Sequence, residues 1–282
     1  MEDVPYYKPS EVVFGEDDYN KLARLVYDRW GISLSSEKFT RTRIKMQSLM
    51  REQGYQDFKS FLHALASSHS AHAFDVLAEK LTINYTFFNR EQRHFEYMRR
   101  SILPEMERKR FNEIRIWCAG CASGEEAYSI AIHFEEYRRS HLPTQDFDYL
   151  MLATDLSRVA LERGLLARYT LEALQKGWSP EIIQRYFHTS KDGYQLHPTL
   201  REKIMFRLLN LKTPEYPMQG KFDLIFCRNV MIYFDEEFRR EMAGRFYNLL
   251  NPGGYLIIGQ TETISQFKTG FQLCTPAIYK KG

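Results

Sequence analysis

The segment Ile114–Ser129 has the residue types needed to hold a ligand against bare backbone. A strand-like apolar run, Ile114–Ala119, leads into a loop of small residues, and a helical pattern follows. Small side chains let a ligand approach the main chain closely, and a helix start offers free N–H donors. The loop contains Gly120, Ala122, Ser123 and Gly124. It lacks both the G-x-G-x-x-G spacing and the P-loop lysine, so a ligand without phosphates fits better than a dinucleotide.

An acidic residue, Asp155, follows the next apolar run, Tyr149–Thr154. A carboxylate at this strand end is placed to accept hydrogen bonds from ribose hydroxyls. The competing interpretation is a tight turn followed by an exposed, helix-capping aspartate.

These residues need a sheet to position them, and the chain after residue 112 supplies its pattern. Short apolar runs alternate with helical ones, which predicts an α/β domain with a parallel sheet and helices on both faces. The predicted strands are Ile114–Ala119, Tyr149–Thr154, Phe222–Cys227 and Tyr255–Gly259, and the predicted helices are Gly124–Arg139, Ser157–Leu166 and Glu236–Leu250. Lys191-Asp192-Gly193 predicts a hairpin turn between Arg185–Thr189 and Tyr194–His197, as a small antiparallel insertion.

The first 85 residues or so show only helical spacing of apolar residues. Four helices are predicted: from Asp17 to Gly31, from Ser35 or Ser36 to about Gly54, from Asp57 or Ser60 through Leu65, and from about Ser70 through Leu81. A further helix is predicted over Arg90–Lys109, with a kink at Pro104. We therefore predict a helical domain at 1–88, a linker helix at 89–111 and an α/β domain at 112–282, with the insertion at about 169–203.

Composition excludes several classes of protein. Hydrophobic residues make up 44% and aromatic residues 15% of the 282 residues, which excludes wholesale disorder. The formal net charge of +3 does not by itself indicate a nucleic-acid binder. The sequence shows no apolar signal core and no run approaching the roughly 18 apolar residues of a membrane span, so we expect a cytoplasmic protein.

The cysteines do not indicate a metal site. Four cysteines are too few for a disulfide scaffold. Cys118 and Cys121 form a C-x-x-C, but a zinc site needs two more ligands, and the sequence has no matching pair or nearby histidine cluster. We interpret both as small packing residues and predict no metal.

Four motifs together resemble the bacterial chemotaxis receptor methyltransferase (CheR) family. The run Leu249–Gly259, with its Pro-Gly-Gly turn, is similar to a segment of Rossmann-like methyltransferases that use S-adenosylmethionine (SAM). More specific are Leu81–Arg90, Cys118–Ile130, Ala153–Asp155 and Phe222–Asp235, the last containing Arg-Asn-Val-Met-Ile-Tyr-Phe. The resemblance covers about residues 16 to 282.

This resemblance implies a fold and an activity. It implies a small helical domain, a linker helix and a methyltransferase domain with a small antiparallel subdomain. It implies methyl transfer from SAM to glutamate side chains on the cytoplasmic helices of chemoreceptors, giving methyl esters and S-adenosylhomocysteine. We further predict a monomer that is not inserted in the membrane and, from its near-neutral charge, binds no nucleic acid.

The resemblance also assigns residues to the site. The implied cofactor-binding residues are Asn84, Thr86, Arg90, Glu126, Asp155, Asn210, Leu211, Arg228 and Asn229. Arg90 and Tyr233 are the implied catalytic residues, Arg90 as a holder of a carboxylate and Tyr233 beside the reacting methyl. From the residues alone, a solvated arginine and a buried aromatic are the competing interpretations. Two positions depart from the family pattern: Ala127 stands where proline is usual, and Asn89 replaces an aromatic residue, which leaves the packing at Arg90 open.

No strong base is expected, because a glutamate with a pKa of about 4.3 is already ionised at pH 7. Catalysis then needs alignment and dehydration of the nucleophile. Two other functions stay open: a catalytically weak, methyltransferase-like scaffold in a signalling array, and a methyltransferase for another small or nucleic substrate. The motifs Asn84/Thr86/Arg90/Asp155/Tyr233 disfavour the scaffold.

A basic helix is the predicted docking surface for the glutamate-rich receptor. Its cations are Lys38, Arg41, Arg43, Lys45 and Arg51. A solvated helix face is the alternative. Some members of the family hold a receptor's C-terminal tail peptide on the antiparallel subdomain. The segment Phe187–Leu200 is short, so we predict independence from that tail.

Overall fold

The computed structural model describes residues 12–66, 70–82, 84–109, 113–141 and 147–282. The chain divides into two compact units, 1–83 and 84–282. The segment 89–111, predicted as a linker, lies in the second unit as far as it is described, since residues 110 and 111 fall outside the described ranges.

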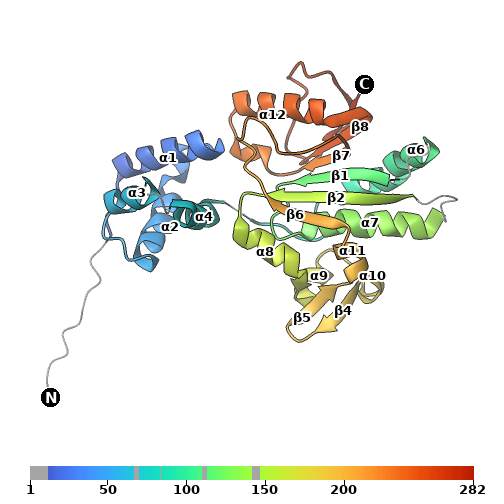
Figure 1. The fold of residues 1–282 in the computed structure, drawn as a ribbon, viewed down its shortest axis with the longest axis horizontal. Helices are drawn as coiled ribbons and strands as arrows, with labels where there is room; N and C mark the ends of the chain where they lie inside the picture. Colours follow the sequence, from blue (N-terminus) through green and yellow to red (C-terminus); the bar gives the residue numbers. More distant parts are fainter. Residues whose placement is uncertain (1–11, 67–69, 83, 110–112, 142–146) are drawn as a thin grey trace. The chain divides into compact units, whose positions relative to one another are not determined.

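The first unit is helical, as predicted (Figure 1). Its helices are α1 (Glu16–Trp30), α2 (Phe39–Glu52), α3 (Phe58–Ala66) and α4 (Ser70–Leu81), with a 3₁₀ turn at Ser36–Lys38. Gly31 ends α1 in the left-handed conformation (φ 72°), which a glycine adopts without steric cost. Asp57 caps the N-terminus of α3, because its Oδ1 accepts the Ser60 N–H at 2.7 Å.

The second unit is built on a seven-stranded sheet with the order β6-β2-β1-β7-β8-β10-β9. Its strands are β1 (Glu113–Ala119), β2 (Asp148–Asp155), β6 (Ile204–Leu208), β7 (Phe222–Cys227), β8 (Leu250–Ile258), β9 (Phe271–Thr275) and β10 (Ile278–Lys281). The five strands from β6 to β8 are parallel, and β10 pairs antiparallel with β8 and with β9. The predicted α/β class is therefore confirmed.

Helices cover both faces of this sheet (Figure 1). One face packs against α7 (Glu125–His141) and α8 (Arg158–Leu166), and the other packs against α12 (Glu236–Leu249). Neighbouring residues of β1 divide between the two cores: Ile116 lies with α7, and Trp117 lies with Phe246 of α12. Burial on both faces explains the continuous apolar runs in the sequence.

The small insertion is a three-stranded antiparallel sheet with the order β3-β5-β4. It contains β3 (Arg168–Tyr169), α9 (Leu171–Gln175), α10 (Pro180–Tyr186), β4 (Phe187–Ser190), β5 (Gly193–Leu196) and α11 (Pro198–Arg201). The predicted hairpin turn is confirmed, since Ser190 pairs with Gly193. Arg185 and Tyr186, predicted in its first strand, instead end α10.

The helix predicted over Arg90–Lys109 is confirmed over most of its length, since the chain is helical without a break from Arg93 to Arg108. The structure has α5 (Arg93–Tyr97), a π-helical turn (Met98–Ile102) and α6 (Leu103–Arg108). Glu91 has a φ of 55°, which is incompatible with a helix starting at Arg90. Pro104 comes just after the π turn, and an interior proline and a π turn are both places where a helix departs from regular α-helical hydrogen bonding.

Candidate functional site

The candidate site lies at the carboxyl ends of the parallel strands, around β1. This strand pairs with β2 on one side and with β7 on the other, and helices cover the two faces of the sheet. Connections that leave in opposite directions open a crevice at the strand ends, where ligands of open α/β sheets bind. Three features that the sequence singled out meet at this edge of the sheet. They are the loop that begins after Ala119, the carboxylate of Asp155 at the end of β2, and the segment that begins after Cys227.

The loop after β1 is held tightly. The N–H groups of Gly120 and Cys121 donate to the Thr154 carbonyl at 2.7 and 2.9 Å. Gly120 has a φ of 84°, and a Cβ there would lie 2.3 Å from Cγ2 of Val230. Glycine is therefore required at 120, and the loop after β1 contacts the segment after β7.

Asp155 is fixed by backbone donors on two sides. Its Oδ2 accepts the Ala122 N–H at 2.8 Å, and its Oδ1 accepts the Ser157 N–H at 2.9 Å. The N-cap of α8 is Ser157 rather than Asp155, since the Ser157 side chain accepts the Ala160 N–H. The carboxylate is thus oriented beside the small-residue loop.

Two further predicted residues follow β6, which neighbours β2. The Leu209 N–H donates to the Asp155 carbonyl at 2.9 Å and brings this segment to Asp155. Asn210 forms a side-chain turn, with its Oδ1 accepting the Lys212 N–H at 3.0 Å, and Leu211 is buried.

Arg228 forms the centre of a buried ion-pair network. Its Nη1 donates to Glu126 Oε2 at 2.9 Å, and its Nη2 lies 3.1 Å from Glu91 Oε2. Nη2 also donates to the carbonyl of Arg90, and the guanidinium lies over the ring of Phe95. The Arg228 side chain has no solvent exposure. This one cation therefore connects β7, the start of α7 and the segment 84–91.

Glu126 lies between this arginine and a thiol. Burial raises the pKa of its carboxyl, although the Arg228 charge opposes the rise. Its Oε1 accepts a hydrogen bond from Cys118 Sγ at 3.3 Å. Burial also raises the pKa of the Cys118 and Cys121 thiols, which favours the unreactive protonated form.

Arg90 and Tyr233 lie near enough to interact electrostatically. Tyr233 is half-buried in the 3₁₀ turn Met231–Tyr233; burial raises its pKa, and the Arg90 charge opposes that rise. Arg90 Nη1 donates to the Tyr85 carbonyl at 3.2 Å, and its guanidinium lies 5.7 Å from the centre of the Phe87 ring. The two residues predicted to act on the methyl acceptor thus share one part of the site.

The segment before Arg90 is anchored through Asn89, one of the two departures from the family pattern. Asn89 has a φ of 59°. Its N–H donates to Ser129 Oγ at 2.9 Å, its Nδ2 donates to the Gly177 carbonyl at 3.2 Å, and its Oδ1 lies 2.9 Å from His133 Nε2. An amide in place of an aromatic residue therefore ties the Arg90 segment to α7. Asn84 and Thr86 lie half-buried on the same segment, outside any helix or strand.

Two glutamates that sequence reasoning missed hold the site together. Glu262 is buried, and its carboxylate accepts the N–H groups of Gly259, Asn229 and Ile232 at 2.6, 2.9 and 3.1 Å. Burial raises its pKa, and these N–H donors oppose the rise. Its position soon after a buried strand is the signal that singled out Asp155. Glu91, adjacent to a motif residue, had no such signal.

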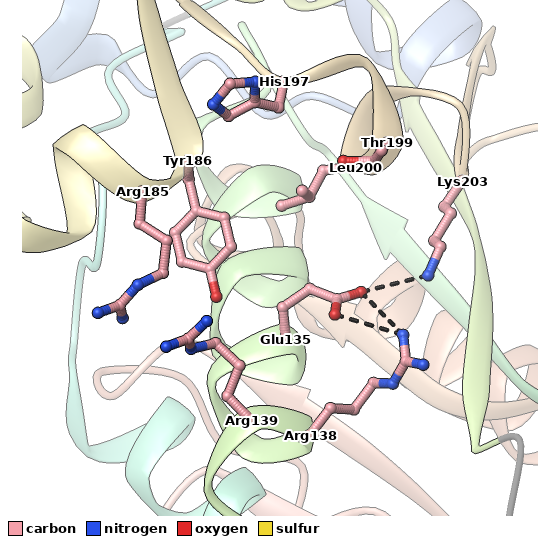
Figure 2. A pocket seen from close by; sticks show the side chains of 9 residues that line it. All are labelled: Glu135, Arg138, Arg139, Arg185, Tyr186, His197, Thr199, Leu200 and Lys203. Carbon is pink, nitrogen blue, oxygen red and sulfur yellow. Dashed lines mark hydrogen bonds and ion pairs between the residues drawn. The ribbon is translucent and has the colours of Figure 1, made fainter. Parts of the chain in front are cut away.

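Figure 2 shows a different cavity, of about 340 Å³, between α7 and the small insertion. Its cations are paired with carboxylates. Arg138 and Lys203 contact Glu135 at 3.3 and 3.2 Å. Arg185 contacts Glu136 at 2.7 Å, and Arg139 lies 3.9 Å from the same residue. The side chains that line this cavity therefore form ion pairs, and the pair between Arg185 and Glu136 connects the insertion to α7.

The described part of the chain offers neither a metal site nor a membrane span. No group of three or more His, Cys, Asp or Glu side chains there is arranged to hold a metal ion. No described helix has the length and apolarity of a membrane span.

Comparison with known families decides what this site belongs to. Residues 84–279 match the family model described as "CheR methyltransferase, SAM binding domain", and residues 17–82 match the "CheR methyltransferase, all-alpha domain". The chain belongs to the CheR methyltransferase family. The resemblance read from the sequence motifs is thereby confirmed, and the site at the strand ends lies in the SAM-binding domain of this family.

Curated relatives extend over nearly the whole chain. A chemotaxis protein methyltransferase of Borreliella burgdorferi is 36% identical and covers 94% of each chain. Chemotaxis protein methyltransferase 1 of Pseudomonas aeruginosa is 32% identical over 88% of this chain and 91% of its own. The Escherichia coli chemotaxis protein methyltransferase is 32% identical over 96% of this chain and 92% of its own.

Proposed function

We propose that this chain transfers the methyl group of SAM to glutamate carboxylates on chemoreceptors, giving glutamate methyl esters and S-adenosylhomocysteine for adaptation in chemotaxis. The observation that carries the proposal is the fixed Asp155 carboxylate at the strand ends of a SAM-binding domain of this family. The network of Arg228, Glu126 and Arg90 ends at the same edge of the sheet.

The residues at this edge fit SAM. Asp155 presents an oriented acceptor for ribose hydroxyls, and each carboxylate oxygen accepts more than one hydrogen bond. The small residues Gly120, Ala122, Ser123 and Gly124 form the loop beside this carboxylate, and the Ala122 N–H is one of its donors. Asn84, Thr86, Asn210, Leu211, Arg228 and Asn229 are the further residues that we assign to the cofactor.

When bound, SAM supplies an activated methyl group on a sulfonium, which is a good leaving group. The acceptor carboxylate is ionised at pH 7, so the protein needs no strong base. We assign Arg90 to a carboxylate, either that of the acceptor or that of the methionine moiety, because a planar guanidinium binds carboxylates in two-point fashion. We assign the Tyr233 hydroxyl to orientation of the acceptor. Alignment and exclusion of water then supply the rate.

We assign receptor docking to the basic face of α2 and the turn before it. Lys38, Arg41, Arg43 and Arg51 are exposed, and Lys45 is half-buried. Within α2 the only acidic residue is Glu52, and it is paired with Lys80 at 2.8 Å. Burial, followed by the charges of Arg41 and Lys80, lowers the pKa of Lys45. An acidic receptor helix complements this basic face.

We further propose that a monomer acts in the cytoplasm and does not depend on the receptor's C-terminal tail. The short hairpin supports tail independence: β4 and β5 have four residues each and a two-residue turn. Deletion of the tail from the receptor is expected to leave the methylation rate nearly unchanged. A large loss on deletion would assign tail binding to this subdomain.

The decisive experiment measures transfer of labelled methyl from SAM to membranes that contain receptor. The released label should be volatile after mild base, as expected for a glutamate methyl ester. Titration calorimetry with S-adenosylhomocysteine accompanies it. Binding without transfer would favour a scaffold that retains its cofactor, and loss of both would refute the proposal.

A further inference from the structure

Glu91 bridges three separate segments of the SAM-binding domain. Its Oε1 accepts the Asn229 Nδ2–H at 3.1 Å. Its Oε2 accepts the Gln260 backbone N–H at 3.1 Å and lies 3.1 Å from Arg228 Nη2. The Glu91 carboxylate thus connects its own segment, directly after Arg90, to the segment after β7 and to the segment after β8.

The backbone at Glu91 is held in an uncommon conformation for this bridge. Its φ of 55° lies in the left-handed region, which costs a residue other than glycine roughly 1–2 kcal/mol. A helical φ at this position would continue α5 backwards toward Arg90. The left-handed turn instead keeps the Glu91 carboxylate in contact with the side chains of Arg228 and Asn229. Only 15% of the Glu91 side chain is exposed.

The charge of Glu91 is part of the balance around Arg228. This buried guanidinium contacts two carboxylates, Glu126 through Nη1 and Glu91 through Nη2. His94 Nδ1 lies 3.5 Å from Glu91, but burial, aided by the Arg228 charge, lowers the His94 pKa to about 4, so this ring is neutral at pH 7. Without Glu91, the Nη2 side of Arg228 keeps only the Arg90 carbonyl among these contacts.

We propose that Glu91 is a positioning residue for SAM binding, which acts by holding Arg228 and Asn229 in place against Arg90. It acts through these residues and makes no assigned contact with the cofactor itself. This inference rests on the proposed function, because the affinity that it concerns is that for SAM and its product.

The test compares Glu91→Gln with a matched control, Glu172→Gln, in the full-length chain. Glu172 is 82% exposed and makes an exposed ion pair with Lys176 at 3.1 Å, so the control removes one charge and one ion pair away from the site. An amide keeps one acceptor oxygen, for Asn229, and places an NH₂ group against the Gln260 N–H and Arg228. We expect the Kd for S-adenosylhomocysteine to rise about tenfold in Glu91→Gln, as for loss of one charge-assisted hydrogen bond, and to stay unchanged in Glu172→Gln.

Two further variants separate positioning from a general structural role. Glu91→Asp keeps the charge on a shorter stem, and its Kd should lie between the wild-type value and that of Glu91→Gln. Combining Glu91→Gln with Asn229→Gly should raise the Kd by less than the product of the two single effects, because Glu91 acts through Asn229. Independent, multiplicative effects would overturn the proposal.

The outcomes for Glu91 and for the proposed function are distinguishable. Absence of S-adenosylhomocysteine binding in the wild-type chain would refute the proposed function. Wild-type affinity in Glu91→Gln would refute only the role of Glu91. Titrations run well below each variant's thermal midpoint, with near-ultraviolet circular dichroism to confirm that the variant is folded.

Discussion

Replacing Asp155 with alanine should affect both the loop after β1 and the cofactor. In the structure its carboxylate accepts the N–H groups of Ala122 and Ser157 at 2.8 and 2.9 Å. Ala122 and Ser157 are buried, so water replaces these hydrogen bonds poorly. Leaving a buried donor unpaired costs about 1–3 kcal/mol, and two such donors give a loss of unfolding free energy of about 2–4 kcal/mol after partial relaxation.

The same substitution removes the acceptor for ribose hydroxyls. We expect cofactor binding to weaken by roughly 1–3 kcal/mol, which corresponds to about a 5- to 150-fold rise in Kd. Titration calorimetry with S-adenosylhomocysteine measures the affinity, and thermal unfolding without ligand measures the stability. The control is Asp192→Ala, which removes a carboxylate that is 66% exposed and pairs with Arg168 at 3.4 Å. Unchanged affinity in folded Asp155→Ala would remove Asp155 from the site, and unchanged stability would refute the anchoring of the loop.

Three further predictions concern the reaction centre, the docking face and pH. Arg90→Ala should lower turnover strongly with an unchanged thermal midpoint, and Tyr233→Phe should bind S-adenosylhomocysteine normally but methylate receptor slowly; wild-type rates in both would refute the assigned transfer site. Charge reversal at Arg41 or Arg43 should slow receptor methylation and leave cofactor affinity unchanged, and equal effects on rate and cofactor affinity would contradict docking. The wild-type rate at low receptor concentration should also fall as salt rises, because the Debye length shrinks from about 10 Å at 0.1 M to about 3 Å at 1 M. Burial lowers the His133 pKa to about 3, so below pH 6.5 the unfolded chain takes up a proton that the folded chain does not. This residue should therefore lower the unfolding free energy by about 1.4 kcal/mol for each pH unit between pH 6.5 and 3. His133→Gln should reduce that slope in urea titrations.

The helical first unit and the central parallel strands could be predicted because their signals are local. The 3.6-residue spacing of apolar residues and the glycine that follows them are sufficient to predict α1 and its end. The strands β1 and β7 appear in the sequence as uninterrupted apolar runs, since both faces of the sheet are covered.

Other elements could not be predicted because their apolar spacing fits more than one backbone. Phe95, Met98 and Ile102 are spaced by three and four, a pattern that continues through a π turn, so the sequence predicts the helix but not the π turn within it. β9 lies at the edge of the sheet and carries polar residues, and β10 and β3, with four and two residues, are too short to show a period. The turn predicted at Pro-Gly-Gly lies inside β8, where Leu250 pairs with Phe222 across a shift in register.

The sequence motifs name candidate site residues one by one, but they do not show how the charges of these residues pair. Arg228 lies 102 positions from Glu126 and 137 positions from Glu91, and no local pattern connects them. The sequence therefore presents Arg228 and Glu126 as two independent cofactor ligands, whereas the structure makes them counter-charges. A buried ion pair that loses one partner leaves an uncompensated charge, at a cost of about 3–5 kcal/mol. The effect of a substitution at Arg228 on SAM affinity thus includes the repulsion between Glu126 and Glu91, and only paired substitutions separate cofactor binding from the balance of charge within the site.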